Sequence, residues 1–197
     1  IILSAPEIAR EENGGTRSTS EHVVLISLKK RSSGEPSNVT IRGISPGAMQ
    51  VRNEVELVSG RMPTPGSQEV IVGNAVWNKF AGTDIDSSIR LAGTDWRVVG
   101  IFNAGNSAFS SEIWGDVEVL MSLFRRDKYT NVTAKLISDG GFATLKERLE
   151  KEPRLSVVVR KEREFYESQS GALSTFIQVI GTFVSVIFSL AAMVGAM

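Results

Sequence analysis

Residues 173–197 read Leu173-Ser-Thr-Phe-Ile-Gln-Val-Ile-Gly-Thr-Phe-Val-Ser-Val-Ile-Phe-Ser-Leu-Ala-Ala-Met-Val-Gly-Ala-Met197, and they divide the chain into two parts. The stretch has no charged side chain, whereas all 22 Lys and Arg and all 22 Asp and Glu residues precede it. A helix of this length, rising about 1.5 Å per residue, spans roughly 37 Å and can cross a hydrocarbon core of about 30 Å. The sequence therefore predicts a water-soluble domain followed by a transmembrane helix at 173–197.

The two ends of the chain suggest a fragment. The chain begins at Ile1 without an initiator Met or a positively charged signal region, and it ends inside the apolar run. We therefore expect it to be a piece of a longer membrane protein.

Composition excludes several classes of function. The formal net charge is zero and no long basic run is present, so a nucleic-acid partner is not expected. The sequence has no Cys, which rules out disulfides, thiolate zinc sites and Cys nucleophiles. It also lacks a G-x-x-x-x-G-K-[ST] phosphate loop, so we place any ATP hydrolysis on a partner chain or outside this sequence. No cofactor is predicted.

Alternating apolar residues predict a β-hairpin near the N-terminus, with strands at 23–30 and 39–44. The segment Arg61-Met-Pro-Thr-Pro-Gly66 is a strong break, and we place a lobe boundary near it. A short buried strand at 69–72 and a helix at 73–80 are expected to follow.

The middle of the chain predicts a second hairpin, from strands at 88–91 and 96–102. A loop rich in Gly, Ser and Asn follows at 103–111. Asp116 is a suitable N-cap for the next helix, whose apolar residues recur at i, i+3, i+4 and i+7. Those residues are Val117, Leu120, Met121 and Phe124.

The last part of the domain predicts a β-α-β unit. A strand at 131–137 precedes a helix with Leu145 and Leu149 on one face, and a strand at 155–160 completes the unit. From residue 161 onward no Pro intervenes, so we expect a charged stalk helix at 161–172 that continues into the membrane.

Several motifs together resemble the extracytoplasmic core domain of MacB-like permeases, the group that includes LolC, LolE and FtsX. The family is characterised by the order of such motifs and has no catalytic signature. The motifs are Gly60-Arg61-Met62 with Glu69-Val-Ile-Val-Gly73, Ile89-Arg-Leu with Trp96-Arg-Val-Val-Gly-Ile-Phe102, Ser107-Ala-Phe-Ser-Ser-Glu-Ile-Trp-Gly-Asp116, and Phe176-Ile-Gln-Val-Ile-Gly181.

The resemblance implies an α+β, two-lobed MacB-like periplasmic domain. Residues 1–59 and 127–160 would form a porter-like α/β lobe, and 60–126 an inserted β-rich lobe. The family further implies a bacterial inner-membrane permease with four spans, whose residues 1–172 lie in the periplasm. Arg160, Lys161 and Arg163 would favour a cytoplasmic location by the positive-inside rule. We follow the resemblance, since large domains are translocated regardless of such charges.

The implied partners are an ABC ATPase subunit or a fused ATPase domain, and a second permease copy or paralogue. A periplasmic adaptor, a lipoprotein or a hydrolase is a further possible partner. The implied role is transmission of ATP-driven conformational change to a periplasmic cargo or partner, for export or lipoprotein and lipid handling. The alternative is an FtsX-like activator of a periplasmic cell-wall hydrolase. A membrane-anchored enzyme and a sensor ectodomain are less favoured.

Residues that could support catalysis have simpler structural interpretations. His22 is the sole histidine, and no Cys or second His supports a metal site. Glu112, Asp116 and Glu118 form the nearest approach to a carboxylate cluster, but helix capping and first-turn acidity explain two of them. We therefore predict no catalytic residue, no metal site and a non-catalytic subunit.

Two further groups are candidates for binding. Trp77 and Trp96 are expected in the core, whereas Trp114, beside Phe109 in the Gly-rich loop, is the best candidate of the three for an exposed residue that docks a partner or cargo. In the apolar run, Gly181, Ser185 and Ser189 recur every four residues, a spacing that allows close helix packing. A permease dimer contact and the ordinary abundance of small residues in membrane helices explain this spacing equally well.

Overall fold

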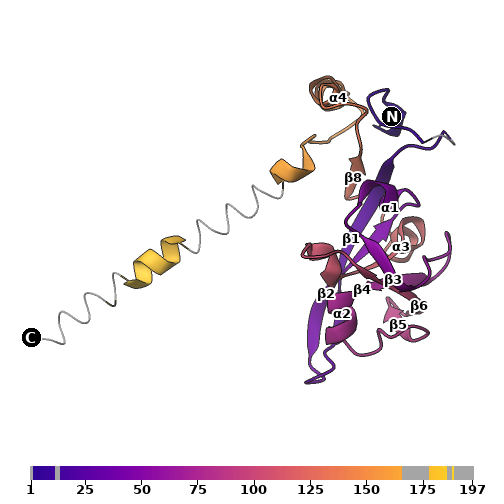
Figure 1. The fold of residues 1–197 in the computed structure, drawn as a ribbon, viewed down its shortest axis with the longest axis vertical. Coiled ribbons are helices and arrows are strands. Elements are labelled where there is room, and N and C mark those ends of the chain that lie inside the picture. Colours follow the sequence, from indigo (N-terminus) through magenta and orange to yellow (C-terminus); the bar gives the residue numbers. More distant parts are fainter. Residues whose placement is uncertain (1, 12–13, 166–177, 186–187, 189–197) are drawn as a thin grey trace, which may run out of the picture. The chain divides into compact units, whose positions relative to one another are not determined.

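The computed structural model describes residues 2–11, 14–165, 178–185 and 188. The chain divides into two compact units, Ile1–Phe142 and Ala143–Met197. The first unit contains a mixed eight-stranded sheet with short helices (Figure 1). The α+β class is therefore confirmed.

The sheet has the strand order β3-β6-β4-β7-β2-β1-β8. The eighth strand, β5, pairs with residues 94–97 of β6, whereas β3 pairs with residues 100–103 of the same strand. The β2–β7 and β4–β6 pairs are parallel, and the remaining pairs are antiparallel. The strands are β1 (Ser18–Lys29), β2 (Pro36–Ile44), β3 (Glu56–Gly60), β4 (Glu69–Gly73), β5 (Ser88–Leu91), β6 (Thr94–Asn103), β7 (Glu112–Asp116) and β8 (Asn131–Ala134).

Short helices connect these strands. They include 3₁₀ helices, labelled η, and α-helices. They are η1 (Ile2–Ser4), α1 (Ala48–Val51), α2 (Asn74–Lys79), η2 (Ala108–Ser111), α3 (Val117–Leu123) and α4 (Gly141–Glu150).

Both faces of the sheet are buried at its centre, which explains the continuous apolar runs of β4 and β6. On one face Val70, Val72 and Trp96 pack with Leu120 of α3. On the other face Ile71 joins a cluster that includes Phe102, Phe109 and Trp114. Since successive side chains of a strand point to opposite faces, this two-sided packing follows from the sequence of β4.

Both predicted hairpins are present. In the β1–β2 pair Val24 lies opposite Ile41. The apolar residues predicted to share one face, Val24, Ile26 and Leu28, are partly buried against the same core cluster. The β5–β6 hairpin closes between Leu91 and Thr94. The predicted helices at 73–80 and after Asp116 are confirmed as α2 and α3.

The structure adds a strand that the sequence did not predict. Residues 112–116, between the predicted loop at 103–111 and the predicted helix, form β7, which lies at the centre of the sheet between β4 and β2. The strand has only five residues, and Gly115 and Asp116 at its end are typical of turns. Its pairing partners are distant in sequence, so no local pattern marks it.

The proposed lobe boundary falls in a loop at 61–68. Strands from the two predicted lobes nevertheless share one sheet, because β7 pairs with β2 and β3 pairs with β6. The division into a porter-like and an inserted lobe stays a prediction, with the qualification that it does not separate two sheets.

In the second unit α4 carries two buried residues, Leu145 and Leu149, as predicted. The predicted strand at 155–160 is wrong: these residues pair with no strand among the described residues. The segment is rich in Val, but a strand also requires a neighbour with which to form a hydrogen-bonded ladder.

The predicted stalk and transmembrane helices fall largely outside the described residues. Residues 162–165 and 178–185 are helical, whereas 166–177, 186–187 and 189–197 are not described. In the described part of the chain, no helix is long and apolar enough to cross a membrane.

Candidate functional site

A network of buried charged side chains lies where β1, β2 and β7 meet. The guanidinium group of Arg42 on β2 donates hydrogen bonds to both carboxylate oxygens of Glu112 on β7, at 2.7 and 2.6 Å. Its remaining terminal nitrogen, Nη1, donates to Oε2 of Glu21 on β1 at 2.6 Å. Arg42 therefore joins three strands through its planar array of donors.

Glu21 is fully buried and receives further donors. Arg52, just after α1, donates from Nε and Nη2 to Oε1 of Glu21 at 3.1 and 2.7 Å. Asn131 on β8 donates to Oε2 at 2.9 Å. The two Arg and two Glu side chains balance in charge, and their mutual attraction offsets part of the desolvation cost of burying them.

This network raises the pKa of the Arg42 guanidinium group. Burial alone would lower the pKa of its guanidinium group, but the hydrogen bonds and negative charges of Glu112 and Glu21 outweigh burial and raise the pKa above its ordinary value. Arg42 therefore remains a cation throughout the accessible pH range.

The predicted exposure of Phe109 and Trp114 is wrong, since the exposed fraction of Trp114 is 0% and that of Phe109 is 5%. Trp114 donates from Nε1 to Oε2 of Glu112 at 2.9 Å. The Phe109 ring lies beneath the Arg52 guanidinium group, whose central carbon is 4.2 Å from the ring centroid. Phe109 is brought to the charged network by η2, whereas Trp114 lies in the central strand β7, and the centroids of the two rings are 5.7 Å apart.

The other two Trp residues divide between core and surface. Trp96 is buried in β6, as predicted, whereas the side chain of Trp77 is 37% exposed, which contradicts its predicted core position. Trp77 lies on the outer face of α2 and donates from Nε1 to Asp84 at 3.0 Å. A helix of six residues buries only one narrow face, and Val76 occupies it.

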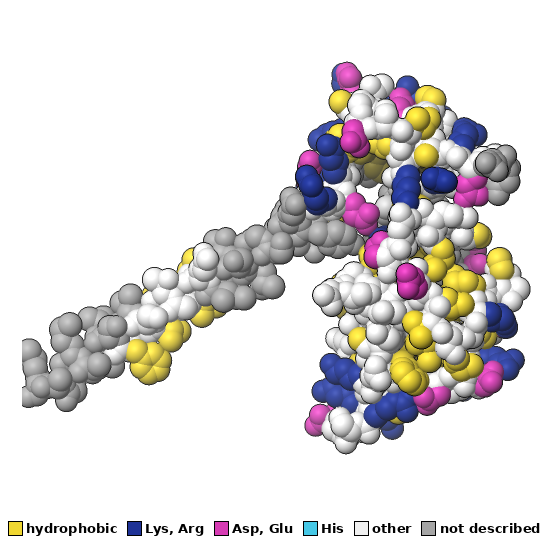
Figure 2. Space-filling model, viewed as in Figure 1, with side chains coloured by type: hydrophobic (Ala, Val, Ile, Leu, Met, Phe, Trp, Pro, Cys, Tyr) yellow, Lys and Arg dark blue, Asp and Glu magenta, His cyan; other side chains and the backbone are white. Residues whose placement is uncertain are grey.

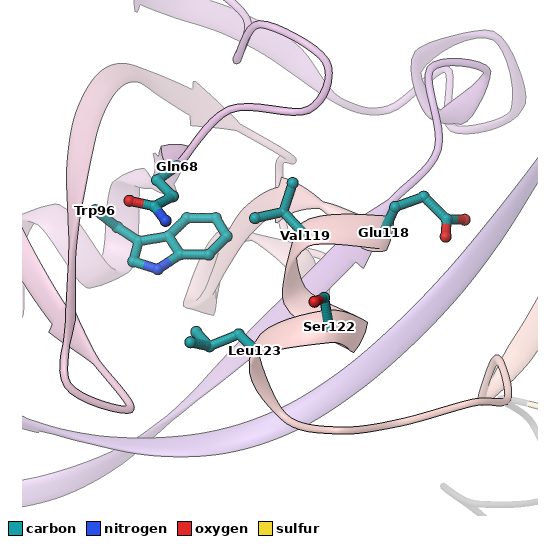
Figure 3. Close-up of a pocket in the computed structure, with 6 residues that line it drawn as sticks. All are labelled: Gln68, Trp96, Glu118, Val119, Ser122 and Leu123. Atoms are coloured by element: carbon teal, nitrogen blue, oxygen red, sulfur yellow. The ribbon is translucent and has the colours of Figure 1, made fainter.

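A surface pocket lies between the start of β4 and α3, on the α3 side of the sheet. Its volume is about 370 Å³, and Figure 3 shows Gln68 beside the Trp96 indole and α3 side chains opposite it. Nε1 of Trp96 has no hydrogen-bond partner among the described residues. The lining residues are Gln68, Trp96, Glu118, Val119, Ser122 and Leu123.

The pocket combines an apolar floor with polar groups at its margin. Glu118 points away from the indole in Figure 3 and accepts a hydrogen bond from the Tyr129 hydroxyl at 2.5 Å. That bond to a carboxylate raises the pKa of the Tyr129 hydroxyl. Apolar side chains with a few polar groups at the margin are an arrangement suited to binding a small polar group or one side chain.

The loop that leads into the pocket is held by Arg61. Its guanidinium group donates to both carboxylate oxygens of Glu69, and the Thr64 backbone N–H donates to Oε2 at 2.9 Å. The hydrogen bonds and charge of Arg61 and the Thr64 bond outweigh partial burial and lower the pKa of Glu69 to about 2. Gly66 N–H also donates to Asp116, which ties this loop to the start of α3.

The three carboxylates that were considered as a cluster have separate structural roles. Glu112 belongs to the buried network, Asp116 caps α3 by accepting from the Glu118 and Val119 N–H groups, and Glu118 binds Tyr129. His22 is buried, with Nδ1 3.2 Å from the Thr130 hydroxyl. Across the described ranges, no group of three or more His, Cys, Asp or Glu side chains could hold a metal ion.

The candidate membrane-packing residues are described only in part. Ser185 donates to the carbonyl of Gly181 at 2.8 Å along the helix at 178–185, and Ser189 lies outside the described residues. Their role in helix packing stays a prediction.

The sequence analysis missed Glu21, Arg42 and Arg52 as central residues. One signal was present, because Arg42 interrupts the apolar strand Val39-Thr-Ile-Arg-Gly-Ile44 at a position flanked by buried residues. A charged residue in a central strand requires a buried partner of opposite charge.

Comparisons with known proteins place this domain in a family. The profile of the MacB-like periplasmic core domain matches residues 3–152. The extracellular domain of the noncanonic ABC-type transporter YknZ from Gram-positive bacteria is similar, with a TM-score of 0.56 and 18% identity, covering 74% of this chain and 74% of that one.

The periplasmic region of MacB from Actinobacillus actinomycetemcomitans has a TM-score of 0.55 and 14% identity, covering 76% of this chain and 69% of that one. These two likenesses establish the fold. No curated protein sequence gives a match.

Proposed function

Because this chain belongs to the family of MacB-like periplasmic core domains, we propose that it transmits the ATP-driven motion of a transporter to a periplasmic cargo or partner. The ATPase belongs to a partner subunit or a fused domain, and two permease copies or paralogues form the transporter. Residues 161–172 serve as the stalk and 173–197 as a transmembrane helix in the bacterial inner membrane. The domain itself performs no covalent chemistry.

The buried charged network is the observation that supports this proposal. It joins Glu21, Arg42 and Arg52, from the first predicted lobe, to Glu112, from the second. A buried ion pair has one geometry of lowest energy, and breaking it leaves an uncompensated charge. Force applied at one strand of this sheet is therefore passed to the other strands and is not dissipated by local rearrangement.

Nucleotide-dependent distances in the intact transporter test this mechanism. Exposed Ser residues lie at 32, in the turn between β1 and β2, and at 59, in β3, and the absence of Cys from this sequence allows each to be replaced by Cys and spin-labelled. In nanodiscs, the distance between Ser32→Cys labels on the two permease copies is expected to change on addition of a non-hydrolysable ATP analogue. The distance between labels at 32 and 59 within one copy is expected to stay constant.

The two distances distinguish the possible outcomes. An unchanged distance between copies, with normal ATP hydrolysis, contradicts motion of the domain. A change within one copy contradicts transmission by a single rigid sheet. Arg42→Met is expected to broaden the distance distribution within one copy, whereas Arg90→Met, which affects only an exposed ion pair, serves as the matched control.

A further inference from the structure

The β1 strand leaves part of its backbone without a partner. Residues Ser18–Glu21 pair with β8 on one side, and Glu21–Lys29 pair with β2 on the other. Beyond Glu21, β8 no longer accompanies β1. The outward-facing backbone groups that lie between the Val23 N–H and the Lys29 carbonyl, here called the open edge, therefore form a free border of the sheet.

The hydrogen bonds at its two ends define the extent of the open edge. At one end Val23 N–H donates to the Thr130 hydroxyl at 3.2 Å. At the other end the carbonyl of Lys29 accepts from Ala81 N–H at 2.9 Å. Since Lys30 N–H donates toward β2, to the carbonyl of Glu35, odd-numbered residues face outward and even-numbered residues face β2.

Leu25 and Ser27 lie at the centre of this edge. Neither their N–H nor their carbonyl groups find a partner among the described residues. The groups from Val23 to Lys29 cover roughly 20 Å of strand at about 3.4 Å per residue, enough to pair with one added strand of five to seven residues. Leu25 is 66% exposed and offers an apolar contact beside this border.

Basic residues lie at both ends of the open edge. Figure 2 shows Lys and Arg side chains gathered at the lower end of the domain, where Figure 1 places the tip of the β1–β2 hairpin. Arg31 pairs with Asp84 there, and Glu35 lies in the turn. Three further cations carry the excess positive charge, namely Lys29, Lys30 and Lys79.

The opposite end is also basic. The exposed segment before Thr130 contains Arg125, Arg126 and Lys128, with a single acidic residue, Asp127. Antiparallel pairing with the β1 strand of a second copy would bring the hairpin tip of one copy beside this segment of the other. Like charges at both ends disfavour that arrangement.

We propose that the open edge of β1 binds an acidic, extended segment of a partner protein, which adds one strand to the sheet. Backbone hydrogen bonds to Leu25 and Ser27 supply the pairing, an apolar side chain of the segment packs on Leu25, and acidic side chains contact the basic groups at both ends. This interaction does not depend on the transmission of ATP-driven motion, and it is measured without nucleotide.

A proline substitution tests the proposal selectively. Pro lacks an N–H group and is tolerated where that group points away from the existing ladder, so Ser27→Pro removes an outward donor and keeps the β1–β2 pairing. Ser27→Thr keeps the donor and is the matched control. The probe is a seven-residue synthetic peptide of alternating Val and Thr with Glu at each end, titrated into the full chain in detergent micelles.

The expected results are specific. The Glu peptide binds and protects the amides of Leu25 and Ser27 from hydrogen exchange, and Ser27→Pro weakens its binding about tenfold while Ser27→Thr does not. A peptide with Lys at each end binds at least tenfold more weakly, and added salt reduces the difference. Far-UV circular dichroism verifies that Ser27→Pro is folded.

Other results overturn the proposal. Equal binding of the Glu and Lys peptides contradicts recognition of acidic side chains by the basic groups. Binding that Ser27→Pro leaves unchanged contradicts pairing of the peptide with the β1 backbone. No binding of the Glu peptide contradicts the proposal outright. Protection of the Leu25 and Ser27 amides without peptide shows that another segment of the same chain already binds the open edge. If that protection rises with protein concentration, a second copy of the chain binds it.

Discussion

Arg42 and Glu112 form a two-point ion pair across the parallel strands β2 and β7, with Nε–Oε2 and Nη2–Oε1 distances of 2.7 and 2.6 Å. The pair joins segments 70 residues apart in sequence, and Trp114 adds a third donor to the same carboxylate. The central strand β7 is thus fixed by side chains as well as by backbone ladders.

Substitution of Arg42 is expected to destabilise the domain strongly. Arg42→Met leaves Glu112 buried with Trp114 as its remaining partner in the network, and loss of one member of a buried ion pair typically costs about 3–5 kcal/mol. Urea denaturation of the chain in detergent, followed by tryptophan fluorescence, measures the free energy of unfolding. The exposed Arg90–Asp95 pair provides the control, because Arg90→Met is expected to change that energy by less than about 1 kcal/mol. Similar effects for the two variants would contradict the assigned burial.

The three Trp residues are expected to differ in solvent access. Acrylamide quenches the fluorescence of exposed indoles, and Trp77 is partly exposed while Trp96 and Trp114 are buried. Trp77→Phe is therefore expected to remove most of the quenchable fluorescence. Trp114→Phe should leave that component in place, and the reverse result would restore the original prediction of an exposed Trp114.

Capping of α3 is expected to contribute measurably to stability. Asp116 accepts hydrogen bonds from Glu118 N–H at 2.9 Å and Val119 N–H at 3.1 Å. Removal of such a cap in Asp116→Ala typically costs about 1–2 kcal/mol. Asp116→Asn keeps an acceptor for the cap and is expected to recover most of the loss in thermal denaturation. Equal losses in both variants would assign the effect to the contact with Gly66.

Close packing between β2 and α3 predicts that Gly43 cannot be enlarged. A Cβ atom at Gly43 would lie 2.7 Å from Cα of Val117, closer than unbonded carbon atoms approach. Gly43→Ala is expected to lower the melting temperature because α3 must shift from the sheet. Gly140 has open space around it, so Gly140→Ala is the matched control and should have little effect.

The Arg61–Glu69 pair predicts an acid-sensitive contribution to stability. The pKa of Glu69 is about 2 in the folded chain, below the ordinary value of 4.5. The contribution is therefore complete above pH 4.5 and is lost as the pH falls from there toward 2. The difference in unfolding free energy between the wild type and Glu69→Gln is expected to shrink across this window. A difference that stays constant from pH 5 to pH 3 would contradict the pairing.

The sequence analysis succeeded where local patterns determine structure. Alternation in β1 and β2, the apolar run of β4 and the cap at Asp116 each depend on a few neighbouring residues, and each led to the observed element. Matching order of motifs also identified the family, which the profile over residues 3–152 supports.

Long-range pairing could not be predicted in the same way. The strand β7 depends on β2 and β4, which lie tens of residues away, and Trp114 is buried because it lies on this central strand and Phe109 of η2 packs against its ring. Residues 155–160 show the opposite error, since they include three consecutive β-branched Val residues but have no partner strand among the described residues. A single sequence contains no direct information about which strands meet.

The pairing of β1 with β8 has a consequence for the order of folding. Ser18–Glu21 meet strand β8 more than 100 residues later, as the Asn131–Glu21 hydrogen bond spans 110 positions. The carboxylate of Glu21 therefore lacks one of its donors until residue 131 has been synthesised and translocated. Pairing across so long a separation requires the intervening loop to close first, and this requirement slows folding. Strand β8 therefore completes both the β1 ladder and the hydrogen bonding of Glu21 only after more than 100 later residues are in place.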